Sequence, residues 1–183
     1  MWEMLRLTAP CVTMPSRPAG RKSPQIEIRP ARRADLDALM ELEQQVFTTD
    51  RLSRRSMRRL LSSPAARVVV AEIGGRLAGA AVALVRPRSR VARLYSIGVV
   101  PKLSGQGVAA ALLGAVETAA IAGKFRCVRL EVHETNAAAI SRYRKSGYRE
   151  FGRHAAYYED GGAALRFEKP LVVPQRHADD TGG

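Results

Sequence analysis

The stretch IGVVPKLSGQGVAAALLGAVETAA, residues 97–120, says more about the fold of this chain than any other. An apolar run stops at Pro101, passes through Gly105 and Gly107, and restarts with alanine and leucine at helical spacing. The first amides of a helix have no internal partners and lie at the positive end of its macrodipole. Glycines let a phosphate approach such amides closely. We therefore expect a helix from about Gly105 to Ala122 whose start binds a phosphate-bearing ligand.

The composition of the chain indicates one globular domain. Of its 183 residues, 46% are hydrophobic and 26% are charged, which is enough for a single core. No apolar stretch is long and uncharged enough to span a bilayer, so we expect no membrane partner. Cys11 and Cys127 have neither metal-ligand spacing nor the density of a disulfide framework. The sequence thus favours a reducing cytoplasm and a protein without a metal.

The net charge of +13 is unevenly distributed along the chain. Six arginines and no acidic residue fall between Arg51 and Arg67, and no Asp or Glu lies between Ile73 and Val116. Such a surface attracts anions over long range, although a solvated basic face without any partner has the same sequence pattern. The charge suits an anionic cofactor as well as a nucleic acid.

Hydrophobic periodicity predicts a mixed α/β domain over residues 26–172. The expected order is a strand, two helices, three strands, a helix, a strand, a helix and a closing strand hairpin. Ser53 and Asn136 are the expected caps of the second and the last helix. This order predicts a sheet that starts antiparallel and ends with parallel crossovers. Residues 1–25 are expected to be a flexible, dispensable basic extension, and residues 173–183 a loose tail.

The glycine segment also fits a different phosphate-binding motif. Residues 105–110, GQGVAA, match the dinucleotide fingerprint G-x-G-x-x-A, with Glu131 near the end of the next strand. However, four residues separate the preceding strand from Gly105. About seventy residues of strand, two helices and hairpin precede the motif, although a dinucleotide fold should begin with it, and little chain is left for further parallel strands. No Gly-Lys-Ser/Thr follows the glycines, which excludes a Walker loop. The sequence therefore disfavours both nucleotide folds.

Two motifs resemble a known family of acyltransferases. They are LYSIGVVPKLSGQGVAAALL at residues 94–113 and LEVHETNAAAISRYRKSGY at residues 130–148. Together with the element order over residues 26–172, they resemble the GNAT superfamily of acetyl-CoA-dependent N-acetyltransferases, and most of all its ribosomal-protein alanine N-terminal acetyltransferase branch. The resemblance implies a mixed α/β sheet with an antiparallel N-terminal part and a parallel, splayed centre, flanked by about four helices. It also implies acetyl transfer from acetyl-CoA to an amine by direct attack in a ternary complex.

The resemblance further implies how acetyl-CoA is bound. The family's pyrophosphate loop begins with Gln or Arg, where this chain has Ser104, but its backbone amides would still cradle the pyrophosphate. The splayed strand before the loop would pair with the pantetheine arm, and an amide near Val99 would donate to the thioester oxygen. Asn136 would contact the cofactor arm in addition to capping its helix. The implied acetyl-CoA-binding residues are Ile97, Gly98, Val99, Gly105, Gln106, Gly107, Val108, Ala109, Ala110, Asn136 and Tyr143.

Glu131 and Tyr143 are the implied catalytic residues. In CVRLEVH, residues 127–133, the period of two places Glu131 and His133 on one face of the strand. The resemblance implies that Glu131 accepts the proton of the amine, directly or through water, and that Tyr143 protonates or hydrogen-bonds the CoA sulfur. A surface ion pair of Glu131 with Arg129 or a neighbour, and core packing of Tyr143, are the alternatives. His133 shares this face and is either a solvent-exposed histidine at the strand end, which we expect, or the reserve base.

The acceptor amine is predicted only as a class. An α-amine is roughly one-tenth neutral at pH 7, whereas a lysine is neutral about once in a few thousand, so a single Glu suits an α-amine better. A peptide or protein N-terminus is therefore favoured, with a small-molecule amine as the alternative. An RNA-engaging enzyme, acting at the ribosome or on aminoacyl-tRNA, stays open because of the arginine-rich residues 51–61. Tyr157 and Tyr158 either line the acceptor mouth or pack within the closing hairpin.

Overall fold

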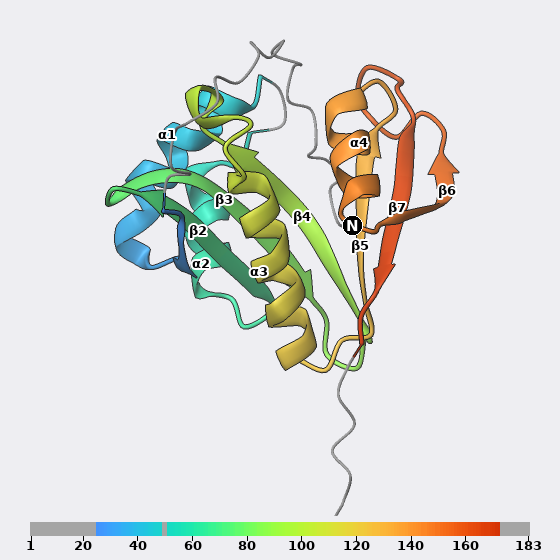
Figure 1. Cartoon of the computed structure of the whole chain (residues 1–183), viewed down its shortest axis with the longest axis horizontal. Helices are drawn as coiled ribbons and strands as arrows, with labels where there is room; N and C mark the ends of the chain where they lie inside the picture. The colour runs from blue at the N-terminus through green and yellow to red at the C-terminus, as the bar shows by residue number, and fades with distance from the viewer. Residues whose placement is uncertain (1–24, 49–50, 173–183) are drawn as a thin grey trace, which may run out of the picture.

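The computed structural model describes residues 25–48 and 51–172, and in them one mixed sheet carries helices on both faces (Figure 1). The predicted α/β class and order of elements are confirmed. The strands are β1 (Glu27–Pro30), β2 (Ala66–Ile73), β3 (Arg76–Val85), β4 (Val91–Val99), β5 (Cys127–His133), β6 (Arg149–His154) and β7 (Ala164–Pro170). The helices are α1 (Leu36–Val46), α2 (Arg54–Ser62), α3 (Val108–Ala122) and α4 (Ala137–Lys145), with 3-10 turns η1 (Arg33–Asp35) and η2 (Pro101–Leu103). The predicted extension, up to residue 24, and the predicted tail lie outside the described residues.

The sheet has the strand order β1-β2-β3-β4-β5-β7-β6. Its neighbours are antiparallel except for β4 and β5, which are parallel. Gly74 and Gly75 turn the chain between β2 and β3 at φ values of 58° and 73°, which suits a two-residue hairpin turn. The expected antiparallel start and parallel centre are therefore both present.

Two hydrophobic clusters lie on opposite faces of the sheet. One packs α3 and α4 against the sheet and includes Leu112, Val128 and Tyr143. The other packs α1 and α2 against β2 and β3 and includes Leu39 and Met57. Figure 1 shows α3 and α4 on the near face, with α1 and α2 behind β2 and β3. The half of the sheet from β1 to β4 is thus covered on both faces.

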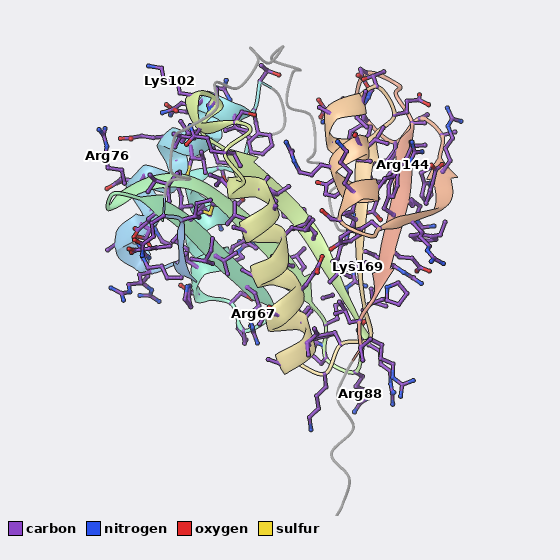
Figure 2. The ribbon with its side chains drawn as sticks, in the orientation of Figure 1. Arg67, Arg76, Arg88, Lys102, Arg144 and Lys169 are labelled. Atoms are coloured by element: carbon purple, nitrogen blue, oxygen red, sulfur yellow. The ribbon has the colours of Figure 1, made fainter. Side chains whose placement is uncertain are left out.

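The parallel strands β4 and β5 splay apart after a short pairing. They pair only between Val91–Arg93 and Cys127–Arg129, and Figure 1 shows them diverging from that end. At the closed end, Lys169 Nζ of β7 contacts Glu117 Oε2 of α3 at 2.6 Å, and Figure 2 shows Lys169 between these two elements. The sheet is therefore held together at one end and open at the other, as the family resemblance implies.

A β-bulge in β4 changes which side chains face each cluster. Ala83 pairs with Leu94 and Val82 with Ser96, so Tyr95 is the extra residue. Leu94, before the bulge, packs in the α3 cluster, and the alternation resumes after it with Ile97 against that same cluster. The bulge thus lies at the point where β4 leaves β5.

Candidate active site

The loop before α3 presents a row of backbone donors. Gly105 and Gly107 have φ values of 80° and 91°, which L side chains rarely adopt. Because of these glycines the helix begins at Val108, three residues later than the sequence predicts. Among the described residues we find no acceptor for the amides of Gly105, Gly107, Val108, Ala109 and Ala110. Free N–H groups at the positive end of a helix form a site for an anion.

Ser104 and Gln106 lie in the same loop, and both are exposed. Their amides are used within the loop: Ser104 N donates to Pro101 O at 3.1 Å, and Gln106 N donates to Leu103 O at 3.4 Å. These bonds keep η2 and the glycine segment in one compact turn before α3.

One edge of β4 faces the splay. Val100 N donates to Ala78 O of β3 at 2.9 Å. Because alternate residues of a strand direct their backbone groups to opposite edges, Gly98 also faces β3, whereas Ile97 and Val99 face away from it. In the described part of the chain β5 pairs with β4 only near its start, so no strand pairs with these two residues on that side. Their N–H and C=O groups can bind an extended ligand.

Glu131 lies on the face of β5 that points away from α3 and α4. Arg93 Nε donates to Glu131 Oε2 at 2.9 Å, and Arg93 Nη2 donates to the Tyr157 hydroxyl at 2.8 Å. Arg166 Nε lies 3.9 Å from Glu131 Oε1. The Glu131 side chain is 15% exposed. Its carboxylate is therefore fixed by Arg93 through one oxygen, and its second oxygen makes the longer contact with Arg166.

Sequence patterns do not mark Arg93 as part of this site. The ion pair of Glu131 with Arg129, given above as an alternative, is not formed, because Arg129 Nε donates to Glu168 Oε2 at 2.9 Å across the β5–β7 register. Glu131 instead forms its ion pair with Arg93. Arg93 lies opposite Arg129 in the β4–β5 register. Only that parallel register brings Arg93 beside Glu131, and no local motif signals it.

His133 is not the exposed residue that the sequence predicts, because it is only 6% exposed. Its Nδ1 accepts a hydrogen bond from Thr135 N at 3.2 Å, so its Nε2 carries the proton toward Asp160 Oδ2 at 3.1 Å. The ring also packs on Tyr158, with 4.6 Å between centroids. Both nitrogens are engaged, which argues against His133 as the reserve base.

Tyr143 lies on α4, on the opposite side of β5 from Glu131, and is 2% exposed. Its ring centroid is 5.8 Å from that of Tyr148 and 6.3 Å from that of Phe167. Burial raises the pKa of the Tyr143 phenol above its usual range. A phenol in this state keeps its proton at neutral pH and can donate it, so core packing and proton donation are compatible at this position.

Tyr157 and Tyr158 follow β6 and lie beside the Glu131 network. Tyr158 is 6% exposed, and its buried hydroxyl has no hydrogen-bond partner in the described residues. Burial raises the pKa of Tyr158, and the nearby Tyr157, Glu131 and Tyr143 raise it further. An unpaired buried hydroxyl costs about 1–3 kcal/mol, so a ligand group that bonded it would be favoured.

Asn136 caps α4, as predicted from the sequence. Its Oδ1 accepts a hydrogen bond from Ala139 N at 3.1 Å, and the helix runs from Ala137 to Lys145. The cap fixes the start of α4, the helix that carries Tyr143.

Residues 25–48 and 51–172 contain neither a metal centre nor a membrane-spanning helix. No group of three or more His, Cys, Asp or Glu side chains there could hold a metal ion. None of the helices in these ranges combines the length and apolar character needed to cross a membrane.

Comparisons with known proteins agree with this arrangement. Residues 36–148 match the model of the acetyltransferase (GNAT) family. Ribosomal-protein alanine N-acetyltransferases from Escherichia coli and Brucella melitensis have similar structures. The first has 24% identity, a TM-score of 0.74 and coverage of 84% of this chain and 98% of its own. The second has 24% identity, a TM-score of 0.70 and coverage of 79% and 99%.

A third similar structure contains coenzyme A. It is the PaiA N-acetyltransferase from Thermoplasma acidophilum, with 18% identity, a TM-score of 0.68 and coverage of 80% of this chain and 99% of its own. At such identities these three structures show the shared fold. A search of curated proteins finds no match.

A mixed sheet that splays at its centre, followed by a helix with free N-terminal amides, is the framework of an acyl-CoA-dependent N-acyltransferase. The chain belongs to the acetyltransferase (GNAT) family, whose model matches more than half of it. It is therefore an acyltransferase that uses acetyl-CoA. The free amides of Gly105 and of residues 107–110, and the open edge of β4, fit such a ligand, which carries a pyrophosphate and an extended amide-bearing arm.

Proposed function

We propose that this protein acetylates the N-terminal α-amine of a protein or peptide. The observation that carries the proposal is the placement of Glu131 and Tyr143 on opposite sides of β5, where β5 splays from β4. The fold similarity to two ribosomal-protein alanine N-acetyltransferases supports the same acceptor class.

Acetyl-CoA would be held mainly by backbone groups. The amides of Gly105 and of residues 107–110 would bind its pyrophosphate, with Gln106 at the loop surface. Ile97 and Val99 would pair with the pantetheine arm, and Gly98 leaves the strand without a side chain at this point. Asn136 would meet the arm from the start of α4. Acetyl-CoA supplies the activated thioester, and the protein orients it.

The two proton transfers would then fall to different side chains. The attacking amine forms a bond to the acetyl carbon and loses a proton to Glu131, whose carboxylate Arg93 holds in place. The Val99 amide donates to the thioester oxygen as negative charge develops there. The carbon–sulfur bond breaks, and the buried Tyr143 phenol gives its proton to the departing sulfur.

The chemistry of the site favours an α-amine as acceptor. An α-amine has a pKa of about 7.7–8.0, so one carboxylate suffices to free it, whereas a lysine near 10.4 demands a stronger base. Tyr157 and Tyr158 would bind the acceptor beside Glu131, because the Tyr158 hydroxyl has no other partner among the described residues. The net charge of +13 disfavours polycationic small amines.

A mass-spectrometric transfer screen tests the proposal. Purified protein and acetyl-CoA are incubated with peptides that begin with alanine, the same peptides with a blocked α-amine and an internal lysine, and a panel of small amines. We expect a single acetyl group on the free α-amine and none on the blocked peptides. Transfer restricted to small amines would refute the protein N-terminus as acceptor while leaving the acetyltransferase intact.

A further inference from the structure

The arginines of α2 have no part in the acetyl-transfer site. The helix starts at Ser53, whose hydroxyl accepts a hydrogen bond from Ser56 N at 3.1 Å. Its inner face buries Met57 at 2% exposure, with Leu60 and Leu61 packed beside it. The outer face carries arginines, and the helix covers the opposite side of the sheet from α3 (Figure 1). This outer face therefore does not take part in binding the acetyl-CoA held before α3.

Three of these arginines lack a carboxylate partner. Arg55, Arg58 and Arg59 are exposed and form no ion pair with any described residue, whereas Arg54 pairs with Asp37 at 2.5 Å. Several arginines elsewhere, on β1, β4, β5, α4 and β6, each pair with a carboxylate. Like charges three or four residues apart on a helix repel each other. The cluster is thus an unneutralised positive surface within two helical turns.

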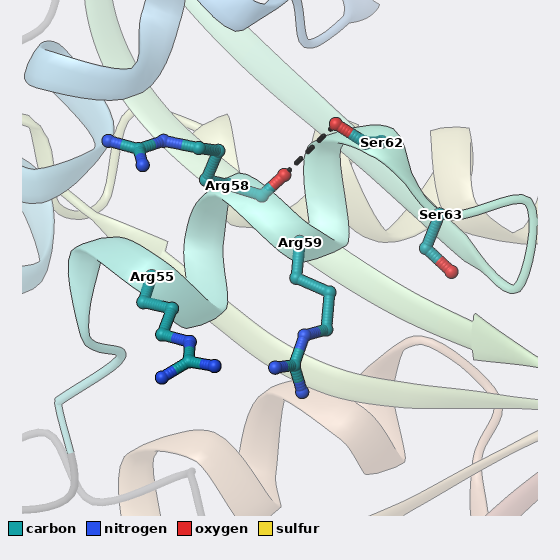
Figure 3. Close-up of a pocket in the computed structure, with 5 residues that line it drawn as sticks. All are labelled: Arg55, Arg58, Arg59, Ser62 and Ser63. Atoms are coloured by element: carbon teal, nitrogen blue, oxygen red, sulfur yellow. Dashed lines mark hydrogen bonds between the residues drawn. The ribbon is translucent and has the colours of Figure 1, made fainter.

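The cluster lines an open hollow on the protein surface (Figure 3). The hollow has a volume of about 490 Å³ and is lined by Arg55, Arg58, Arg59, Ser62 and Ser63. A neighbouring hollow of about 340 Å³ shares Arg58 and Ser62 and adds Arg33, Leu36 and Leu61. Figure 3 shows Arg55 and Arg59 extending to one side of the helix and Arg58 to the other. The two hollows therefore adjoin at Arg58 and Ser62.

The geometry suits a chain of phosphates. From Arg55 to Ser62 the helix rises by roughly 10 Å, which is long enough to face more than one phosphate of a polynucleotide. Guanidinium groups bind the oxygens of a phosphate in pairs, so three arginines along the helix can bind successive phosphates. The apolar face of α2 is buried in the core, so the helix cannot insert into a lipid surface. No aromatic side chain lines either hollow, so bases have no stacking platform there.

Two serines favour RNA over DNA. The Ser62 hydroxyl donates to Arg58 O at 3.1 Å, which leaves its oxygen free to accept a hydrogen bond. The Ser63 oxygen accepts from Ala65 N at 3.1 Å, which leaves its hydroxyl hydrogen free to donate. The ribose 2′-hydroxyl is both a donor and an acceptor, and it is the group that distinguishes RNA from DNA.

We propose that the outer face of α2 is a docking surface for RNA, bound through its phosphates and 2′-hydroxyls without sequence preference. Arg55, Arg58 and Arg59 bind phosphates, and Ser62 and Ser63 bind the ribose. This surface acts independently of the acetyl-transfer site, so the proposal does not rest on the identity of the acceptor amine.

The test measures binding of fluorescent single-stranded RNA by anisotropy over a range of KCl concentrations. The variant carries R55Q, R58Q and R59Q, and the matched control carries R76Q, R90Q and R149Q. The control arginines are also exposed and without a carboxylate partner in the described residues, and Figure 2 shows Arg76 well away from the sheet's splayed centre. Circular dichroism and thermal unfolding confirm that both triple variants fold.

We expect the α2 variant to bind RNA at least about tenfold more weakly, and its salt slope to fall by about two, since each single-strand phosphate contact contributes about 0.7. The control variant should keep most of the RNA affinity and most of the salt slope of the wild type. Homopolymers of different bases should bind alike, and DNA of the same sequence more weakly, with S62A and S63A removing that preference. Equal losses in both triple variants, equal binding of DNA by the wild type, or equal displacement of RNA by polyglutamate would overturn the proposal.

Discussion

The two halves of the sheet differ in how their faces are covered. In the half from β1 to β4, Val70 and Ala71 point to opposite faces and both are 0% exposed. In the half formed by β5, β7 and β6, Leu130 is 0% exposed, but Phe151 is 37% exposed. Glu131 of β5 is ion-paired on the side of the sheet where α1 and α2 cover only the first half.

This difference explains where the chemistry is found. An unpaired charge in a core is costly, and even a paired one recovers its desolvation only with good geometry. The first half is therefore built from small apolar residues, and in the function we propose it binds acetyl-CoA through its backbone, so we call it the binding half. The second half has a face open enough to hold the half-buried charged side chains of Glu131, Arg129 and Arg166. In the same proposal, the second half carries the group that accepts the proton of the amine.

The largest effect should come from the binding half. We expect Gly107→Glu to abolish CoA binding, because it adds a side chain at φ 91° and a negative charge where the free amides meet phosphate. Gly114→Glu is the matched control: a Cβ at Gly114 meets nothing within 4 Å, and the site is exposed on the same helix. Isothermal titration calorimetry with CoA measures both. An unchanged affinity of Gly107→Glu for CoA would show that the loop is not part of the binding site.

The next largest effect should be on turnover, and its pH dependence should differ between Glu131 and Tyr143, which lie on the two sides of β5. We expect Glu131→Gln and Tyr143→Phe each to lose a factor of about 10²–10⁴ in turnover while still binding CoA. Raising the pH toward the pKa of the amine should rescue Glu131→Gln, since solvent then supplies neutral amine. It should not rescue Tyr143→Phe. In the wild type, burial raises the pKa of Tyr143, so its phenol should remain protonated, and active as an acid, up to at least about pH 10.

The measurement is a pH–rate profile for the wild type and both variants with one acceptor peptide. Losses that are equal and independent of pH would contradict the division of roles. Full activity in Glu131→Gln would assign proton removal to water, because His133 has both nitrogens engaged.

Replacing one glycine in each half by alanine compares how tightly the two halves are packed. A Cβ on Gly79 would lie 2.6 Å from Gly98 O, a backbone atom, so Gly79→Ala should destabilise the protein by about 1–3 kcal/mol. A Cβ on Gly152 would come no closer than 3.9 Å to Arg166, so Gly152→Ala should change stability by less than about 1 kcal/mol. Urea denaturation measures both. Equal effects would mean that the two halves are packed alike.

The smallest effect concerns an ion pair at the edge of the binding half. Hydrogen bonds from Arg29, and then from the Arg32 amide, outweigh burial and lower the pKa of Asp35. A lowered pKa stabilises the fold above the unfolded value near 3.9, and this contribution is lost as the pH falls through the lower folded value. Asp35→Asn should thus lower the free energy of unfolding by about 1 kcal/mol at pH 7, and by progressively less below about pH 4.

Asp37→Asn is the control for that change. Asp37 pairs with Arg54, but its side chain is 76% exposed, so its replacement should have little effect at any pH. Thermal unfolding from pH 2 to pH 7 measures both variants. A cost for Asp35→Asn that stays constant down to pH 2 would show that the carboxylate charge is not its source.

Much of the fold and part of the site could be predicted because their signals are local. The apolar periods of the strands and helices, the Gly74-Gly75 turn and the Asn136 cap all depend on residues close in sequence. The expected start of α3 was wrong by three residues, because the glycines that promote helix entry also take conformations outside the helix. Glu131 and Tyr143 could be singled out because family motifs contain them.

The sequence by itself determined the order of elements, the alternation of β5 and the free amides before α3, because each follows from spacing along a few residues. Only the tertiary structure decided which charges meet. Arg93 reaches Glu131 through a parallel register across 38 residues, and His133 is buried by Asp160 and Tyr158 from a loop about 27 residues away. These partners depend on how strands distant in sequence pack together. The strand register is the one in which many contacts together give the lowest free energy, and no local sequence pattern predicts it.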